Sequence, residues 1–262
     1  MVVNSKVPYV TGYNSICEIN ALHPDMMMDI GVVKLDVNDV YVNSASRERA
    51  ILLIEGEVIY KWEGQAVTMK RVSCFDDNPI CLHLPKDVNV EIVGLGPSEL
   101  MYQAAENETV FESKLYRPED TVTDVFGKDV LGNTSIRSVR TVIDDTIAPY
   151  SNLVIGEVIN HPGKWSSYPP HDHVQPEVYH YRFLPETGFG FSLIGDEASK
   201  VEHKSTSMIH SNVVHPQCSA PGYAMYYIWM IPHAPKRWLK DRNFEEKHTW
   251  LLEEDAQVWP YK

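Results

Sequence analysis

Short runs of alternating or β-branched apolar residues, separated by turn residues, dominate the chain. This pattern is typical of the strands of β sandwiches and barrels, and helix-period segments are few. We expect an all-β protein with one or two short helical turns. Among the turn signals, Glu55-Gly56-Glu57 is expected to separate two strands. The predicted strands cover residues 32–35, 50–54, 57–62, 88–93, 153–158, 178–183, 190–194 and 225–230.

An internal repeat bears on how many domains these strands form. Shifting the chain by 126 residues places residues 84–89 on residues 210–215 and, without a gap, Tyr102 on Ile228. The match is one of strand pattern more than of identity. It predicts two tandem β barrels, residues 1–125 and 126–262, with the boundary in a polar stretch. One elongated sandwich is the alternative.

Composition and charge narrow the functional class. Apolar residues make up 44% and charged residues 23% of the 262 residues, which is ordinary for a globular protein. The formal net charge of −13 repels phosphate backbones and anionic lipid, so we expect no nucleic-acid and no membrane partner. The first residues form no apolar signal region, which favours a cytoplasmic protein. Four scattered cysteines indicate neither a disulfide framework nor a thiolate metal site.

Histidine is concentrated in the second half of the chain, where the sharpest cluster of candidate ligands lies. His171 and His173 are two residues apart, so on a strand they face the same side. Glu177 opens the next strand, and His215 arrives from a later one. Three imidazole nitrogens and one carboxylate suit one divalent ion, with zinc favoured by affinity and manganese or iron by availability. In the first half Asn89 matches His215, and we expect a metal-free barrel there.

The spacing H-x-H-x3-E, with a histidine 38 residues further on, resembles the metal-binding signature of the cupin superfamily, whose members are jelly-roll barrels. The segments GKWSSYPPH (163–171), EVYHYRF (177–183), HP (215–216) and APGYAMYY (220–227) resemble the two-cupin 5-deoxy-glucuronate isomerases of inositol catabolism. The related 5-keto-4-deoxyuronate isomerases share the barrel and the ligand set. The resemblance implies a bicupin and a metal-dependent aldose–ketose isomerase acting on a deoxy-uronate sugar.

Two departures from these isomerases bear on the substrate. Between His173 and Glu177 the family usually carries a longer acidic insertion, whereas this chain has only residues 174–176. Before His215 the family commonly has Pro, Arg and Gly, and this chain has residues 211–213, Ser-Asn-Val. The metal can survive both changes, but the substrate preference does not follow from the resemblance.

Strand alternation selects candidates for catalysis. Counting by two from Glu177 places Tyr179 and Tyr181 on the inward face, and we expect these three residues to carry the proton transfers. Arg182 offers the planar fork that binds a carboxylate, although alternation places it outward and a bulge would be needed to reverse this. The remaining substrate-binding candidates, which flank the first ligands, are Tyr168 and Lys164.

Two other functional classes stay open. A cupin dioxygenase would use the same three histidines and one glutamate to hold iron. A sugar-binding cupin without turnover would have the ligands but no base. A homodimer is expected, because two-barrel proteins often associate through exposed strand edges.

Overall fold

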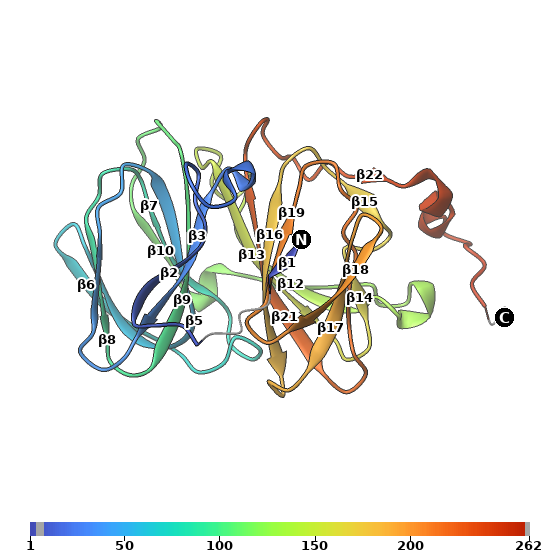
Figure 1. Cartoon of the computed structure of the whole chain (residues 1–262), viewed down its shortest axis with the longest axis horizontal. Helices are drawn as coiled ribbons and strands as arrows, with labels where there is room; N and C mark the ends of the chain where they lie inside the picture. Colours follow the sequence, from blue (N-terminus) through green and yellow to red (C-terminus); the bar gives the residue numbers. More distant parts are fainter. Residues whose placement is uncertain (4–7, 260–262) are drawn as a thin grey trace.

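The computed structural model describes residues 1–3 and 8–259, which form two β barrels lying side by side (Figure 1). A nine-stranded sheet builds the first barrel, and a seven-stranded sheet and a four-stranded sheet build the second. The predicted all-β class is confirmed. The described chain contains no helix that could span a membrane.

Apart from β1, which belongs to the second barrel, the strands of the first barrel precede those of the second along the chain. The first barrel contains β2 (Gly12–Cys17), β3 (Asp29–Leu35), β4 (Val40–Asn43), β5 (Glu48–Trp62), β6 (Gln65–Arg71), β7 (Ile80–Leu84), β8 (Val90–Gly94), β9 (Ser98–Ala105) and β10 (Lys114–Tyr116). The second contains β1 (Val2–Val3), β11 (Thr123–Phe126), β12 (Arg137–Ile143), β13 (Leu153–Asn160), β14 (Trp165–Ser166), β15 (His171–Asp172), β16 (Glu177–Leu184), β17 (Phe189–Ile194), β18 (Glu197–Glu202), β19 (Thr206–Ile209), β20 (Gln217–Ser219), β21 (Ala224–Pro232) and β22 (Asn243–Phe244).

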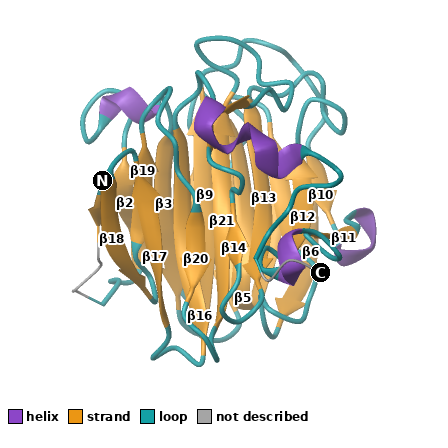
Figure 2. Ribbon diagram, turned by 90° about the vertical axis from the view of Figure 1, so that its right-hand side faces the viewer, coloured by secondary structure: helices purple, strands orange, loops and turns teal. Residues whose placement is uncertain are grey.

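Helical structure is slightly more frequent than expected and lies at the periphery of the strands (Figure 2). The described residues contain four 3₁₀ segments instead of one or two helical turns. The longest of them lies near the C-terminus, beyond β22. The four segments are Pro24–Met26, Pro118–Asp120, Leu131–Asn133 and Glu246–Leu252.

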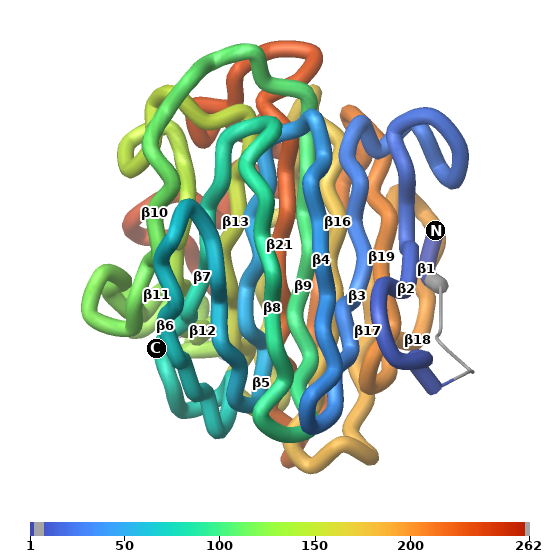
Figure 3. The backbone as a smooth tube through the Cα atoms, turned by 90° about the vertical axis from the view of Figure 1, so that its left-hand side faces the viewer, coloured from blue at the N-terminus to red at the C-terminus, as the bar shows by residue number. Residues whose placement is uncertain are grey.

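The expected turn at Glu55-Gly56-Glu57 is wrong, because β5 runs through it as one strand. The strand pairs with β7 and β9 before Gly56 and with β6 and β8 from Gly56 onward, with a register shift between Leu53 and Glu55. Gly56 has φ +116°, and a Cβ there would lie 2.2 Å from Ser98 Oγ. Glycine therefore bends the strand and carries it to the outer sheet of the barrel, where β4 and β8 lie (Figure 3).

The repeat exists in the topology, but its ungapped alignment needs correction. The order β7-β5-β9-β3 in the first barrel matches β19-β16-β21-β13 in the second, and β9 and β21 begin 126 residues apart. However, Tyr102 packs in the core of the first barrel, whereas Ile228 packs between the barrels. The alignment of β9 with β21 must therefore be shifted by one residue, because a shift by one residue exchanges the two faces of a strand.

The ends of the first half take part in the second barrel. β1 pairs with β19, and β11 pairs with β12, so both belong to the seven-stranded sheet. The sequence-based boundary between residues 125 and 126 falls inside β11. The chain therefore begins on the second barrel before it builds the first.

The two barrels share an apolar core between their large sheets. Alternate residues of β16 separate its two faces: Tyr179 and Tyr181 pack inside the second barrel, and Val178 packs toward the first. On the other side, Leu52 of β5 and Met101 of β9 contribute to the same interface. The first barrel thus covers the outward face of β16, which is not exposed to solvent.

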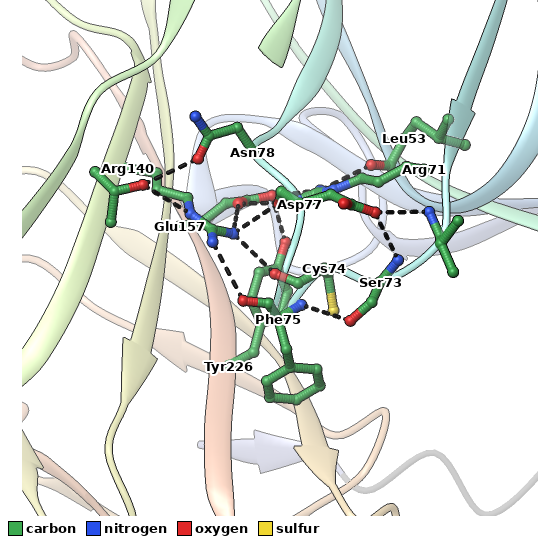
Figure 4. Close-up of polar contacts among 12 residues, drawn as sticks. Leu53, Arg71, Ser73, Cys74, Phe75, Asp77, Asn78, Arg140, Glu157 and Tyr226 are labelled. Carbon is green, nitrogen blue, oxygen red and sulfur yellow. Dashed lines mark hydrogen bonds and ion pairs between the residues drawn. The ribbon is translucent and has the colours of Figure 1, made fainter. Parts of the chain in front are cut away.

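A buried ion pair crosses this interface (Figure 4). Arg71 Nη1 and Nη2 of the first barrel donate to Glu157 Oε1 and Oε2 of the second at 2.7 and 2.9 Å, and both side chains have 0% exposure. Arg71 also donates to the carbonyl oxygens of Leu53 and Asp77. The Tyr226 hydroxyl donates to Glu157 Oε1 at 2.7 Å. The charges are therefore desolvated but extensively hydrogen bonded.

Replacing Arg71 by alanine leaves the Glu157 carboxylate buried without its bidentate partner. We expect the free energy of unfolding to fall by about 3–5 kcal/mol, the usual cost of removing one member of a buried pair. Urea unfolding followed by circular dichroism measures this. The matched control is Lys61→Ala, which breaks an ion pair to Glu91 between half-exposed side chains and should cost less than about 1 kcal/mol. Equal losses in both variants would contradict the expectation.

Candidate metal centre

Three of the four predicted ligands meet at one mouth of the second barrel. His173 lies between β15 and β16, Glu177 is the first residue of β16, and His215 precedes β20. Their candidate ligand atoms all lie within 4.8 Å of one another, and all three residues are buried. Segments that are distant in sequence thus converge where β16 begins.

Each histidine of the predicted set is oriented by a backbone carbonyl two residues away. Nδ1 of His171 lies 2.8 Å from the oxygen of Pro169, and that of His173 lies 3.0 Å from the oxygen of Gln175. His215 Nδ1 lies 2.8 Å from the oxygen of Val213. Since a carbonyl only accepts, these Nδ1 atoms carry hydrogen, and Nε2 is left to bind a metal. Such outer contacts commonly orient metal-binding histidines.

Glu177 joins the histidines. Its Oε2 lies 3.0 Å from His215 Nε2 and 3.3 Å from His173 Nε2, and it accepts a hydrogen bond from the Tyr179 hydroxyl at 3.1 Å. Burial alone would raise the pKa of Glu177, but hydrogen bonds from the two histidines outweigh it and lower the pKa to about 2. In the absence of a metal, Nε2 of these histidines carries the proton that makes this bond, and a metal ion would replace that proton. The carboxylate is therefore ionised at neutral pH, and the donor set fits a divalent cation.

His171 stands next to this cluster. Its ring centroid lies 5.5 Å from that of His215 and 5.5 Å from that of Phe244 in the C-terminal segment. Burial, together with the neighbouring His215, lowers the pKa of His171 to about 4, although its bond to Pro169 opposes the shift. A neutral imidazole at pH 7 keeps the lone pair that a metal ligand needs.

In the first barrel a cation occupies the position that corresponds to Glu177. Arg49 pairs with Leu84, the last residue of β7, as Glu177 pairs with Ile209, the last residue of β19. The Arg49 guanidinium donates to Asn43 Oδ1 and to two backbone carbonyl oxygens. A fixed positive charge there opposes the binding of a metal cation. Asn89, the residue that sequence matched to His215, is exposed instead of facing a barrel interior.

A cavity of about 360 Å³ opens beside the candidate ligands, within the usual size of small-molecule sites. Of the substrate and catalytic candidates from sequence, Tyr168, Glu177 and Tyr179 line it. Tyr181 faces the barrel interior but does not line the cavity; its hydroxyl donates to Gln217 Oε1 and is also within hydrogen-bond distance of the Ser207 hydroxyl.

The two basic candidates lie elsewhere. Arg182 faces the first barrel, as alternation predicts, and its guanidinium pairs with Glu99 and donates to His180 Nε2. Lys164 precedes β14 and is absent from the cavity lining, as is Arg182. Neither side chain is placed to contact a ligand in this cavity.

Sequence reasoning missed the basic and indole groups of the cavity. They come from β12, from β21 and from the segment between β21 and β22, so no local motif joins them. These lining residues are Arg137, Trp229, Trp238, Lys240 and Arg242.

A double β barrel with a histidine–carboxylate cluster at the mouth of one barrel defines a bicupin. A model of the KduI/IolB family matches residues 3–251, and the chain belongs to this family. The 5-deoxy-glucuronate isomerase of Bacillus velezensis is 25% identical over 261 residues, covering 92% of this chain and 94% of that protein. The enzyme of the same name from Halalkalibacterium halodurans is 28% identical over 201 residues, 70% of this chain and 71% of its own.

Solved structures agree on the fold. An IolB-like protein from Salmonella typhimurium superposes with a TM-score of 0.84 at 21% identity, covering 96% of this chain and 99% of that chain. Oxalate decarboxylase from Bacillus subtilis, at 9% identity, gives a TM-score of 0.61 over 86% of this chain and 73% of its own. The predicted bicupin fold and the family resemblance are confirmed.

The ligand geometry predicts one divalent ion per chain. In the double variant His171→Ala/His173→Ala the ion should be lost, because two of its four predicted donors are removed. Both side chains lie at the barrel mouth, so the fold should persist. Elemental analysis after gel filtration measures the stoichiometry. The control Asn89→His should still hold a single ion, because Arg49 keeps its charge in the first barrel. A stoichiometric ion in the double variant, or two ions per wild-type chain, would contradict the assignment.

Proposed function

We propose that this protein is a metal-dependent aldose–ketose isomerase acting on a deoxy-uronate sugar such as 5-deoxy-glucuronate. Membership in the KduI/IolB family and the names of its relatives support this reading. One observation carries this proposal: the ligand atoms of His173, Glu177 and His215 lie close together at the wall of one cavity, and the Tyr179 hydroxyl donates to Glu177 there.

The metal would be held by His171, His173, Glu177 and His215, and when bound it supplies a Lewis acid that polarises the sugar carbonyl. The reaction moves one hydrogen between adjacent carbons and one proton between their oxygens, so atoms balance without any oxidant. The chain itself must hold and return those protons.

Tyr179 is the residue that we propose for this proton transfer. Its hydroxyl lies 3.1 Å from Glu177 Oε2 and 3.0 Å from Ser167 Oγ, so it can pass a proton along a hydrogen-bonded path at the cavity wall. Tyr181, bonded to Ser207 and Gln217, supports the barrel interior behind it. Tyr168 borders the cavity and is proposed to contact substrate.

The remaining alternatives are a 5-keto-4-deoxyuronate isomerase, a cupin dioxygenase and a sugar-binding cupin. An isomerisation assay without oxygen distinguishes an isomerase from a dioxygenase, because an isomerase needs no oxygen. Any turnover of substrate distinguishes these two enzymes from a binding protein. A homodimer stays part of the proposal and is measured by analytical ultracentrifugation.

Tyr179→Phe should lower kcat by about 10²–10⁴, the usual contribution of a positioned proton donor or acceptor. The bound metal should stay at the wild-type stoichiometry, because the substitution removes only the hydroxyl bonded to Glu177 and keeps the ring that packs against His215. Tyr181→Phe is the matched control: it removes a hydroxyl two residues along the same strand and should change kcat far less. Anaerobic kinetics with metal analysis of each variant decide between them, and a larger loss in Tyr181→Phe would reverse the roles.

The short connection at residues 174–176 is expected to shift or broaden specificity relative to a 5-deoxy-glucuronate enzyme. Gln175 is buried there; its carbonyl orients His173, and its side chain donates to the oxygen of Lys236 at 2.8 Å. The loop thus holds a ligand and the C-terminal segment without extending over the cavity mouth. Comparing kcat/KM for 5-deoxy-glucuronate, glucuronate, 4-deoxy-5-keto-uronate and neutral aldoses measures this. A strict preference for 5-deoxy-glucuronate would refute it.

A further inference from the structure

Two guanidinium groups line the cavity without a carboxylate partner among the described residues. Arg137, the first residue of β12, donates Nη1 to the oxygen of Ser135 at 2.9 Å and lies over the Phe126 ring at 5.6 Å. Arg242 immediately precedes β22 and comes from the opposite end of the second half. Neither takes part in an ion pair within the described chain, so their charges are not neutralised by the protein.

Five of the nine arginines of this chain, which carries a net charge of −13, form an ion pair among the described residues. Arg71, Arg182 and Arg237 each have an acidic partner. Lys240, a third cation at the cavity, is paired with Asp144 at 2.9 Å. Among the lysines and arginines that line the cavity, Arg137 and Arg242 are therefore the two without an acidic partner in the described chain.

The two positive charges also act on each other. Burial lowers the pKa of Arg137, and the nearby charge of Arg242 lowers it further, while Tyr227 and Tyr179 oppose the shift. Asp124 and Glu177 are the carboxylates in the lining, but Asp124 is exposed and Glu177 is bonded to histidines. An anion between the two guanidinium groups would relieve their repulsion.

A second, independent observation also indicates a ligand rich in oxygen atoms. The indole Nε1 atoms of Trp229 and Trp238 are buried and have no hydrogen-bond acceptor among the described residues, although both side chains line the cavity. The two tryptophans are only 8% and 7% exposed. An unmatched buried donor is costly, so a ligand that supplies acceptors would be favoured. Gly156 permits this placement, because a Cβ there would lie 2.5 Å from the Trp229 ring.

We infer that Arg137 and Arg242 bind the carboxylate of the substrate, and that the indole groups of Trp229 and Trp238 donate to its hydroxyl oxygens. Planar guanidinium forks match a carboxylate, and indole nitrogens donate but never accept. This inference rests on the proposed function for the reacting sugar, and it gives to Arg137 and Arg242 the role that sequence assigned to Arg182.

The test measures binding separately from turnover. Isothermal titration compares D-glucuronate with D-glucose, which differ at the carboxylate, on zinc-loaded and on metal-stripped protein. Wild-type protein should bind glucuronate more tightly in both forms. Arg137→Gln and Arg242→Gln should each weaken glucuronate binding about tenfold to a hundredfold, the range for a lost charged hydrogen bond, with little effect on glucose. Arg137→Lys, which keeps the charge without the fork, should lose less.

Lys240→Gln is the matched control, because it removes a cavity cation that Asp144 already neutralises, and it should change glucuronate affinity less than threefold. Thermal melting of each variant checks that the fold persists. Equal affinity of wild-type protein for both sugars would overturn the inference, as would a glucuronate preference that survives in the double variant Arg137→Gln/Arg242→Gln. Carboxylate-dependent binding without anaerobic isomerisation would refute the proposed function and leave this inference standing.

Discussion

The ion pair between Arg71 and Glu157 constrains the rest of the structure, because it fixes one barrel against the other where neither charge reaches water. The Coulomb attraction of a buried pair offsets its desolvation only while the hydrogen-bond geometry is kept. β13 and β21, which supply Glu157 and Tyr226, are therefore held at a set position on the first barrel. β21 lies between β13 and β16 in the large sheet that carries the site.

β16 shows how this packing serves the site. Its alternate residues divide between two environments: Glu177 and Tyr179 face the cavity, while Val178 and Arg182 face the first barrel. A sheet with one face on a cavity and the other on solvent would need polar residues outside. Here the first barrel covers that face, so the strand that begins with a metal ligand is buried on both sides and rigid.

The two barrels thus have different roles on one topology. In the second, histidines held by backbone carbonyls surround Glu177. In the first, Arg49 lies at the corresponding place and satisfies its guanidinium with Asn43 and carbonyl oxygens. At corresponding positions the second barrel thus has a carboxylate among histidines that could hold a cation, and the first has a guanidinium bonded to the protein's own oxygens. The first barrel buries the outward face of β16, the strand that begins with Glu177.

Local sequence periods determined a large part of this protein. The runs predicted as strands all lie largely within observed strands, although others such as β9 and β12 were not predicted. Alternation also predicted the inward face of Tyr179, and the spacing of His173 and Glu177 placed two of the three converging residues, because these features depend on neighbours a few residues apart. Gly56 was misread as a turn, since a bend within a strand and a turn between strands share the same residue type.

Only the tertiary structure decided which residues distant in sequence contact one another. Arg182 finds Glu99, 83 residues away, and so leaves the cavity to Arg137 and Arg242, which reach it from β12 and from the C-terminal segment. The one-residue shift in the internal repeat likewise became visible only from which faces of β9 and β21 pack in the core. The physical reason is that charges and apolar faces are matched across barrels by packing, and no sequence period encodes which distant residue will be opposite.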